Sequence, residues 1–124
     1  MHRSPKLALA AVGLVIALAA CTPQEVAIFG AITGDDRALV TDGQLQSLRA
    51  CESGGRYDAV SSGGAYRGAY QFSQGTWNGV ADRNYPWLAD RDPAQVERWW
   101  QDAMARALYA ERGWSPWPHC GAGL

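Results

Sequence analysis

The chain has 124 residues, 48% apolar and 19% charged, which is enough for about one domain. Its formal net charge of −1 gives no sign of the basic surface that nucleic-acid binders carry, so we expect no nucleic-acid partner. Six Trp, five Tyr and two Phe exclude wholesale disorder.

The first twenty residues predict an export signal. Arg3 and Lys6 precede residues 7–20, an unbroken run of apolar and glycine residues with the length of a signal-peptide core rather than a transmembrane helix. The run ends in Leu-Ala-Ala-Cys, which resembles the bacterial lipobox, whose cysteine is lipidated and becomes the mature N-terminus. We therefore predict a lipoprotein at the outer face of the cytoplasmic membrane, anchored through Cys21. The alternative is an ordinary signal peptide with an incidental cysteine and a secreted product.

Residues 21–42 are predicted to be the lipid anchor and a linker. A weak apolar patch over residues 26–32 is broken by Gly30, and a Gly-Asp-Asp turn signal follows. We expect a largely irregular spacer. The alternative is a helix or edge strand over residues 25–33 that packs on the domain.

The folded domain is expected over residues 43–121, beginning with a helix that Asp42 would cap. Leu45, Leu48 and Cys51 recur every three residues on one face of this helix, and a double glycine ends it.

The middle of the domain lacks a clear helical period. From Tyr66 to Phe72 aromatic and glycine residues alternate, which indicates a short irregular strand or a tight loop. Ser73 is predicted to cap a short helix through Val80.

The last helix has the clearest signals. Asp92 would cap it, Pro93 would take its first position, and Gly113 would end it. Its helically spaced apolar stripe consists of Val96, Trp99, Trp100, Ala103, Met104 and Ala107. We assign this stripe to the core; the alternative is that the two adjacent tryptophans form a sugar-binding platform.

Cys51 and Cys120 lie at opposite ends of the domain and are predicted to form a disulfide, because we expect the chain to be exported. Closing a loop of about 70 residues would contribute about 4 kcal/mol under the chain-entropy model. A metal site is not expected, since His119 is the one histidine beyond the signal segment and metal sites need three or four ligands.

The residues favour acid–base chemistry by a carboxylate. The chain has no Gly-x-Ser-x-Gly, phosphate loop or dinucleotide fingerprint. Glu52 follows the predicted bridge cysteine at a helix end and precedes Ser-Gly-Gly, which would let a ligand approach closely. The alternative for Glu52 is an ordinary solvated residue at a helix end.

Three ordered motifs carry a resemblance to a known family. They are Cys51-Glu52-Ser53-Gly54-Gly55, Tyr66-Arg67-Gly68-Ala69-Tyr70-Gln71-Phe72-Ser73-Gln74-Gly75-Thr76-Trp77 and Gly113-Trp114-Ser115-Pro116-Trp117-Pro118-His119-Cys120. Together they resemble the catalytic domain of resuscitation-promoting factors, over about residues 45–121.

The resemblance implies a mostly α, α+β lysozyme-like fold with a loop-rich or short β middle and one disulfide. It implies cleavage of the β-1,4 bond between N-acetylmuramic acid and N-acetylglucosamine in peptidoglycan glycan strands, without a cofactor. Glu52 matches the family's general acid. Tyr66, Gln71 and Thr76 match positions that line the sugar cleft. The tryptophans of these motifs, Trp77, Trp114 and Trp117, we assign mainly to the core.

The chain departs from the family pattern at five positions. Arg67 replaces a tyrosine, Ala69 a glycine, Tyr70 a small aliphatic residue, Arg112 a frequent glutamine, and Leu45 a tryptophan. Arg67 and Arg112 could contact muramyl lactate or peptide carboxylates, or could be solvated surface residues.

The leading hypothesis is therefore an exported peptidoglycan-cleaving enzyme with a role in wall remodelling or resuscitation. The alternative is a catalytically weak wall-binding or signalling lipoprotein on the same fold. The family motifs supply no second acid, and the nearest candidate is Asp58. We therefore favour lytic transglycosylation over plain hydrolysis, because glycoside hydrolysis canonically uses two carboxylates.

Overall fold

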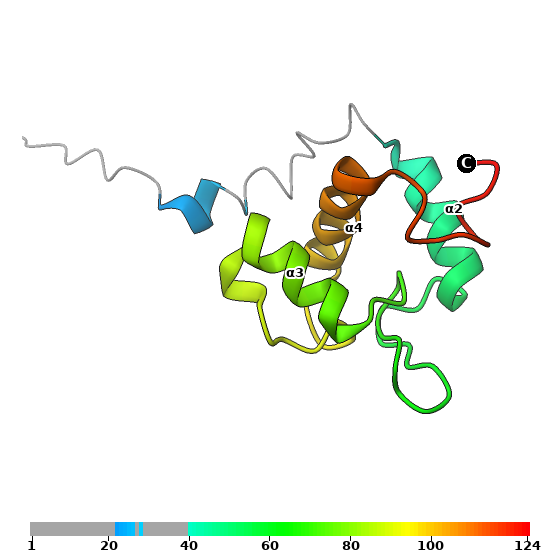
Figure 1. The fold of residues 1–124 in the computed structure, drawn as a ribbon, viewed down its shortest axis with the longest axis horizontal. Coiled ribbons are helices and arrows are strands. Elements are labelled where there is room, and N and C mark those ends of the chain that lie inside the picture. Colours follow the sequence, from blue (N-terminus) through cyan, green and yellow to red (C-terminus); the bar gives the residue numbers. More distant parts are fainter. Residues whose placement is uncertain (1–21, 27, 29–39) are drawn as a thin grey trace, which may run out of the picture.

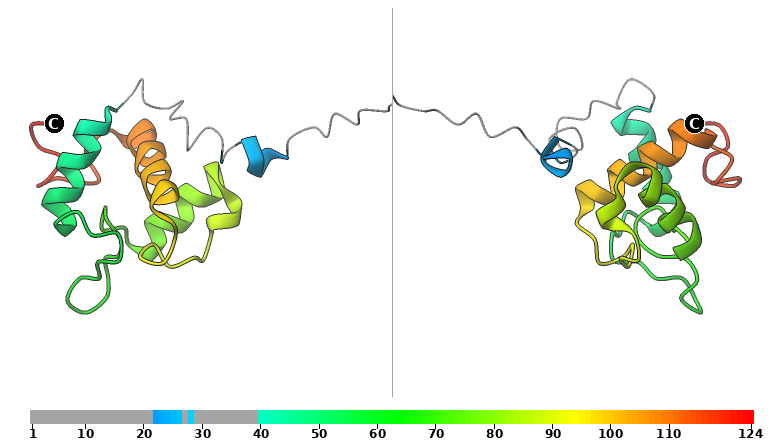
Figure 2. Two further views of the ribbon diagram at one scale, coloured as in Figure 1. Left: turned by 180° about the vertical axis from the view of Figure 1, so that it is seen from behind. Right: turned by 60° about the vertical axis from the view of Figure 1, so that its left-hand side comes forward.

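The computed structural model describes residues 22–26, 28 and 40–124, so the predicted signal segment and Cys21 lie outside the described residues. Its main elements are α2 (Asp42–Ser53), α3 (Gln74–Asn84), the 3₁₀ turn η2 (Pro86–Leu88) and α4 (Arg98–Arg112). Helix α4 lies between α2 and α3, while the loop between α2 and α3 projects to one side (Figures 1 and 2).

Helix α4 is the centre of the core. Its residues from Trp100 to Leu108 are buried except for Asp102, which is half-buried. The predicted one-sided stripe therefore underestimates how much of this helix is covered by its neighbours. Trp100 is in the core as expected, but Trp99 is 42% exposed, so the assignment of Trp99 to the core is wrong. The two are adjacent, and neighbouring residues in a helix point about 100° apart.

The start of α2 differs from the prediction by one residue. Thr41 is the cap: its hydroxyl accepts from the Gln44 N–H (3.1 Å), and the Gln44 side chain accepts from the Thr41 N–H (2.9 Å). This reciprocal capping box leaves the Asp42 carboxylate to accept from Arg106 of α4. Gly54 ends the helix in the left-handed conformation (φ +66°), as the double glycine predicts.

The cap of α3 is confirmed, whereas the start of α4 lies later than predicted. Ser73 accepts from the Thr76 N–H (3.2 Å) at the start of α3. Asp92 does accept from the Ala94 N–H (2.9 Å), but it caps only a turn. The Val96 carbonyl then accepts from the Gln101 side chain (2.8 Å), and the helix begins only at Arg98. Gly113 ends α4 as predicted, its N–H donating to the Tyr109 carbonyl.

The segment from Gly54 to Ser73 consists of turns. Within the described residues it holds two isolated antiparallel bridges, which pair Arg67 with Val60 and with Phe72. A buried glutamine of α4, Gln101, fastens this segment by accepting from the Ala69 N–H (2.9 Å) and donating to the Tyr57 carbonyl (3.0 Å). The expected mostly helical domain with a loop-rich middle is thus confirmed.

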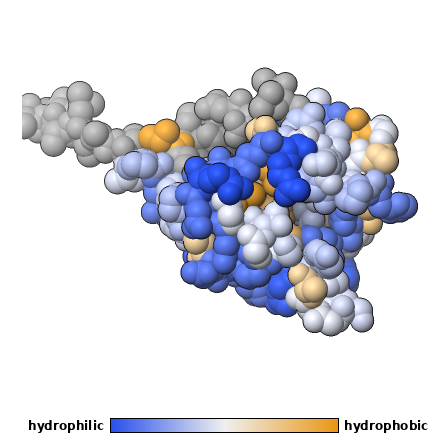
Figure 3. Space-filling view, viewed as in Figure 1, coloured by the Kyte–Doolittle hydropathy of each residue, from blue (hydrophilic) through white to orange (hydrophobic). Residues whose placement is uncertain are grey.

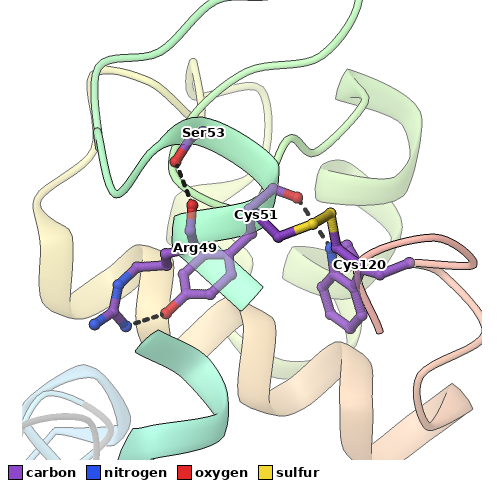
Figure 4. Close-up of a disulfide and its surroundings, with 6 residues drawn as sticks. Arg49, Cys51, Ser53 and Cys120 are labelled. Atoms are coloured by element: carbon purple, nitrogen blue, oxygen red, sulfur yellow. Dashed lines mark hydrogen bonds between the residues drawn. A yellow bond between two sulfur atoms is a disulfide. The ribbon is translucent and has the colours of Figure 1, made fainter. Parts of the chain in front are cut away.

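The disulfide between Cys51 and Cys120 is present, with Cα atoms 5.6 Å apart. Figure 4 shows it joining the last turn of α2 to the C-terminal segment. In the same turn, the Ser53 hydroxyl donates to the Arg49 carbonyl (3.1 Å). The bridge therefore fixes the end of α2 against the chain that follows α4.

Part of the expected linker is helical. Residues 23–26 and 28 have helical backbone, and Ile28 packs against the core, which agrees in part with the alternative of a packed helix. Among the described residues, no helix has both the length and the apolar character that crossing a bilayer requires. The face of the domain drawn in Figure 3 is mainly hydrophilic, with apolar residues in small patches.

Candidate active site

Glu52 lies in the last turn of α2, next to the disulfide, and is half-buried. It lines a cleft of about 240 Å³ whose other walls are Tyr66, Gln71, Pro116, Trp117 and Pro118. Burial raises the pKa of Glu52, and the charge of His119 opposes this rise. A partly desolvated carboxyl of this kind retains a proton at higher pH than a solvated one, as a general acid must.

A second cleft, of about 400 Å³, shares five of these walls: Tyr66, Gln71, Pro116, Trp117 and Pro118. Thr76 and Arg112 line this larger cleft, and Glu52 lines only the smaller one. Because they share these walls, the two clefts adjoin, and together they are called the groove. The structure thus brings Glu52 together with Tyr66 and Gln71 and places Thr76 further along the same groove.

Gln71 has an unusual backbone for its residue type. Its φ of +53° is in the left-handed region, which costs a non-glycine residue about 1 kcal/mol or more. Its side chain donates to the Gly68 carbonyl (3.0 Å), which holds the amide at the groove wall. Strain that persists at a lining residue is typical of functional sites.

Tyr66 and Trp117 present different surfaces to the groove. Tyr66 is 53% exposed, so its ring is available for stacking. Trp117 is 4% exposed, and its indole N–H donates to the Tyr70 carbonyl (3.0 Å). Trp77 is fully buried, so Trp77 and Trp117 are core residues as expected, while Trp114 is half-buried and packs against the core. Trp117 also forms a wall of both clefts.

Asp58 does not line either cleft and is exposed. Among the residues that line the two clefts, Glu52 is the one carboxylate. Within residues 22–26, 28 and 40–124, no cluster of three or more His, Cys, Asp or Glu side chains is placed to hold a metal ion.

A polar network behind the groove was not predicted from the sequence. Asp102 of α4 accepts from Tyr57 (2.8 Å), Tyr70 (2.5 Å) and Arg49 (3.3 Å), and Arg49 also donates to the Tyr70 hydroxyl (2.8 Å). Burial and the adjacent Asp102 raise the pKa of Tyr57 to about 12 and raise that of Tyr70 as well, so both remain donors. Arg49 is one turn before Glu52 on α2, so the network fixes the helix that carries the candidate acid.

No local signal could have revealed this network, because its hydrogen-bonded pairs are 21 to 53 residues apart in the chain. Pro116 and Pro118, which line both clefts, are also new as site residues, although the third motif contains them. Their position on either side of Trp117 was the available signal.

Comparison with known proteins agrees with this geometry. The model of the transglycosylase-like domain family matches residues 40–120. The chain is 34% identical to resuscitation-promoting factor Rpf1 of Corynebacterium glutamicum over 77% of its own length and 49% of that protein. It is 31% identical to resuscitation-promoting factor RpfA of Mycobacterium tuberculosis over 81% of its own length and 25% of that protein.

A further relative is the probable transglycosylase SceD of Staphylococcus haemolyticus, 40% identical over 59% of this chain and 30% of that protein. The chain therefore spans from a quarter to about half of these curated relatives. The family match covers the whole region that holds Glu52, the groove and the disulfide. The chain belongs to the transglycosylase-like domain family, with a domain similar to those of the resuscitation-promoting factors.

Proposed function

We propose that this chain cleaves the β-1,4 bond between N-acetylmuramic acid and N-acetylglucosamine in peptidoglycan, with Glu52 as the acid and then the base. The observation that carries the proposal is the position of Glu52 as the one carboxylate lining an open groove. Membership of the transglycosylase-like family supports the reaction class.

The reaction begins with proton transfer from Glu52 to the glycosidic oxygen. The bond between that oxygen and the muramyl C1 breaks, N-acetylglucosamine leaves as an alcohol, and C1 becomes oxocarbenium-like. Burial favours the protonated form of Glu52 that this step needs. Tyr66 can stack on a sugar ring, while Gln71 and Thr76 can hydrogen-bond acetamido and hydroxyl groups.

The second step uses the substrate's own nucleophile. The muramyl C6 hydroxyl attacks C1, and the ionised Glu52 takes its proton, which gives a 1,6-anhydromuramyl end and restores the acid. This route is supported by the absence of Asp58 from the cleft walls, because hydrolysis by two carboxylates needs a second one within about 5–9.5 Å of the first.

The test is digestion of peptidoglycan by the purified chain, with the fragments analysed by mass spectrometry. We expect fragments lighter by one water than hydrolysis products. Glu52→Gln should lower the rate by at least about 10²-fold while the circular dichroism spectrum is retained. A folded Glu52→Gln variant with near wild-type activity would refute the role of Glu52. Reducing-end products, together with loss of activity in Asp58→Asn, would instead make Asp58 the second catalytic group and the enzyme a hydrolase.

We also propose that the chain is exported through residues 1–20 and anchored by a lipid on Cys21. The disulfide supports export, because such bridges persist in oxidising compartments. Cell fractionation tests the anchor: Cys21→Ser should move the protein out of the membrane fraction. An unchanged membrane association of Cys21→Ser would contradict lipidation.

A further inference from the structure

Two arginines distinguish this chain from the pattern of its family, and the structure separates their roles. Arg67 is already engaged: its Nε and Nη2 donate to the two carboxylate oxygens of Asp92 at 2.7 and 2.6 Å. This bidentate pair fastens the loop between α2 and α3 to the segment before α4. Arg67 does not line either cleft, so it is not available to a ligand there.

Arg112 is in the opposite situation. It is exposed at the last position of α4 and is the one formally charged side chain lining the larger cleft. Its backbone carbonyl accepts from the Ser115 hydroxyl (2.8 Å), but its guanidinium has no hydrogen bond or ion pair within the described part of the chain.

The adjacent carboxylate, Glu111, forms no hydrogen bond or ion pair with Arg112. Glu111 accepts two hydrogen bonds from Arg83, at 3.1 and 2.7 Å, and a third from Asn84 at 2.8 Å. These contacts direct the Glu111 carboxylate of α4 toward α3. The hydrogen bond from Arg83 is the main cause that lowers the pKa of Glu111, and Arg112 lowers it only through its charge and as the smallest of the causes, so the guanidinium hydrogen-bonding groups of Arg112 remain available to the groove. The positive charge and the carboxylate of Glu52 belong to different parts of that groove, because each lines only one of the two clefts.

We propose that Arg112 determines specificity by binding a carboxylate carried on the lactyl arm of a muramyl residue. In a glycan strand the sugar rings are neutral, and the negative charge is on that arm: either the free lactyl carboxylate of a peptide-stripped strand or a carboxylate of the stem peptide. The planar guanidinium matches a carboxylate in a two-bond geometry that a glutamine amide cannot provide. This inference rests on the proposed function and names the feature of the substrate that the groove selects.

Binding in the Glu52→Gln background tests the inference without requiring turnover. The probes are soluble glycan fragments in four forms: peptide-stripped with free lactyl carboxylates, peptide-bearing, peptide-bearing with amidated carboxylates, and neutral oligomers of N-acetylglucosamine. Adding Arg112→Gln should raise the Kd of a carboxylate-bearing form about 3- to 10-fold. This range lies between the effect on Kd of losing an exposed ion pair and that of losing a charged hydrogen bond. The Kd of the amidated and neutral forms should stay within about twofold. The form that loses affinity identifies the carboxylate.

Arg91→Gln is the matched control, because this substitution removes the same charge. Arg91 is exposed and lines neither cleft. It should leave all four Kd values unchanged, and Arg112→Lys should restore only part of the affinity. Raising the salt concentration should reduce the effect of Arg112→Gln.

Equal losses on charged and neutral fragments, or no loss on any, would overturn the role of Arg112. A protein that binds none of the four would overturn it as well. Failure of the proposed function is a separate result: the wild-type chain would then release no fragments from peptidoglycan, whatever the pattern of Kd values.

Discussion

Removing the disulfide should cost this domain a large part of its stability. Cys51 and Cys120 are separated by 69 residues in the chain, and a closed loop of about 70 residues corresponds to about 4 kcal/mol in the chain-entropy model. Small domains have a total free energy of unfolding of about 5–15 kcal/mol. For a domain of this size each kcal/mol shifts Tm by about 4–8 °C, so the double variant Cys51→Ala/Cys120→Ala should lose about 15–30 °C.

Urea unfolding followed by tryptophan fluorescence measures this loss. Three samples are compared: the oxidised wild type, the reduced wild type and the double variant. The last two should unfold at similar urea concentrations, and reductant should have no effect on the double variant. Activity should fall too, even below the unfolding midpoint, because the bridge holds Glu52 opposite the Pro116–Pro118 wall of its cleft.

A loss below about 1 kcal/mol would refute this reasoning. It would mean that the unfolded chain is already compact without the bridge, so that removing the bridge releases little conformational entropy.

Three further predictions concern single residues. Cleavage needs protonated Glu52, so kcat/KM should fall as the pH rises through the pKa of Glu52. Since burial raises that pKa and the charge of His119 lowers it, His119→Gln should move the fall in kcat/KM to higher pH. A fall that stays at the same pH or moves to lower pH would contradict the coupling. The raised pKa also means that ionised Glu52 destabilises the folded state. Glu52→Gln should therefore increase the free energy of unfolding at about pH 7.5, where Glu52 is ionised, and should give no such gain near about pH 4. An equal gain at both pH values would argue against a desolvated charge. Gly68→Ala should destabilise by about 2–4 kcal/mol, since its φ is +82° and a Cβ would lie 2.6 Å from Gln101 Oε1. Gly63→Ala, with φ +83° and open space around it, should cost only about 1 kcal/mol in the same unfolding assay.

Local chemistry was enough to predict the features that act within a few residues. The Ser73 cap, the end of α2 at Gly54 and the end of α4 at Gly113 each depend on one turn of backbone. The cysteine pair could be assigned because few combinations were available. The position of Glu52 beside that bridge followed from its place in the chain.

Features set by distant partners could not be predicted from the sequence. The start of α4 depends on Gln101, whose side chain donates a hydrogen bond to the Val96 carbonyl. The exposure of Trp99 depends on which neighbours cover the helix. Likewise, nothing near Arg67 in the sequence shows that Asp92 will engage it. The difference between Arg67 and Arg112, which decides the charge of the groove, is therefore visible only in three dimensions.

The contact of Arg106 has a mechanical consequence. Arg106 is buried in α4, and its guanidinium donates to the Val40 carbonyl (2.6 Å) and to the Asp42 carboxylate. Any tension transmitted along the residues that precede Val40 would therefore act first on the interior helix, and only afterwards on the turn that holds Glu52. A load on this side of the chain would have to break that contact before it could pull α2 away from α4. The entry point of the chain is thus reinforced at some distance from the groove, so the domain could be held by its N-terminal segment while the groove keeps its shape.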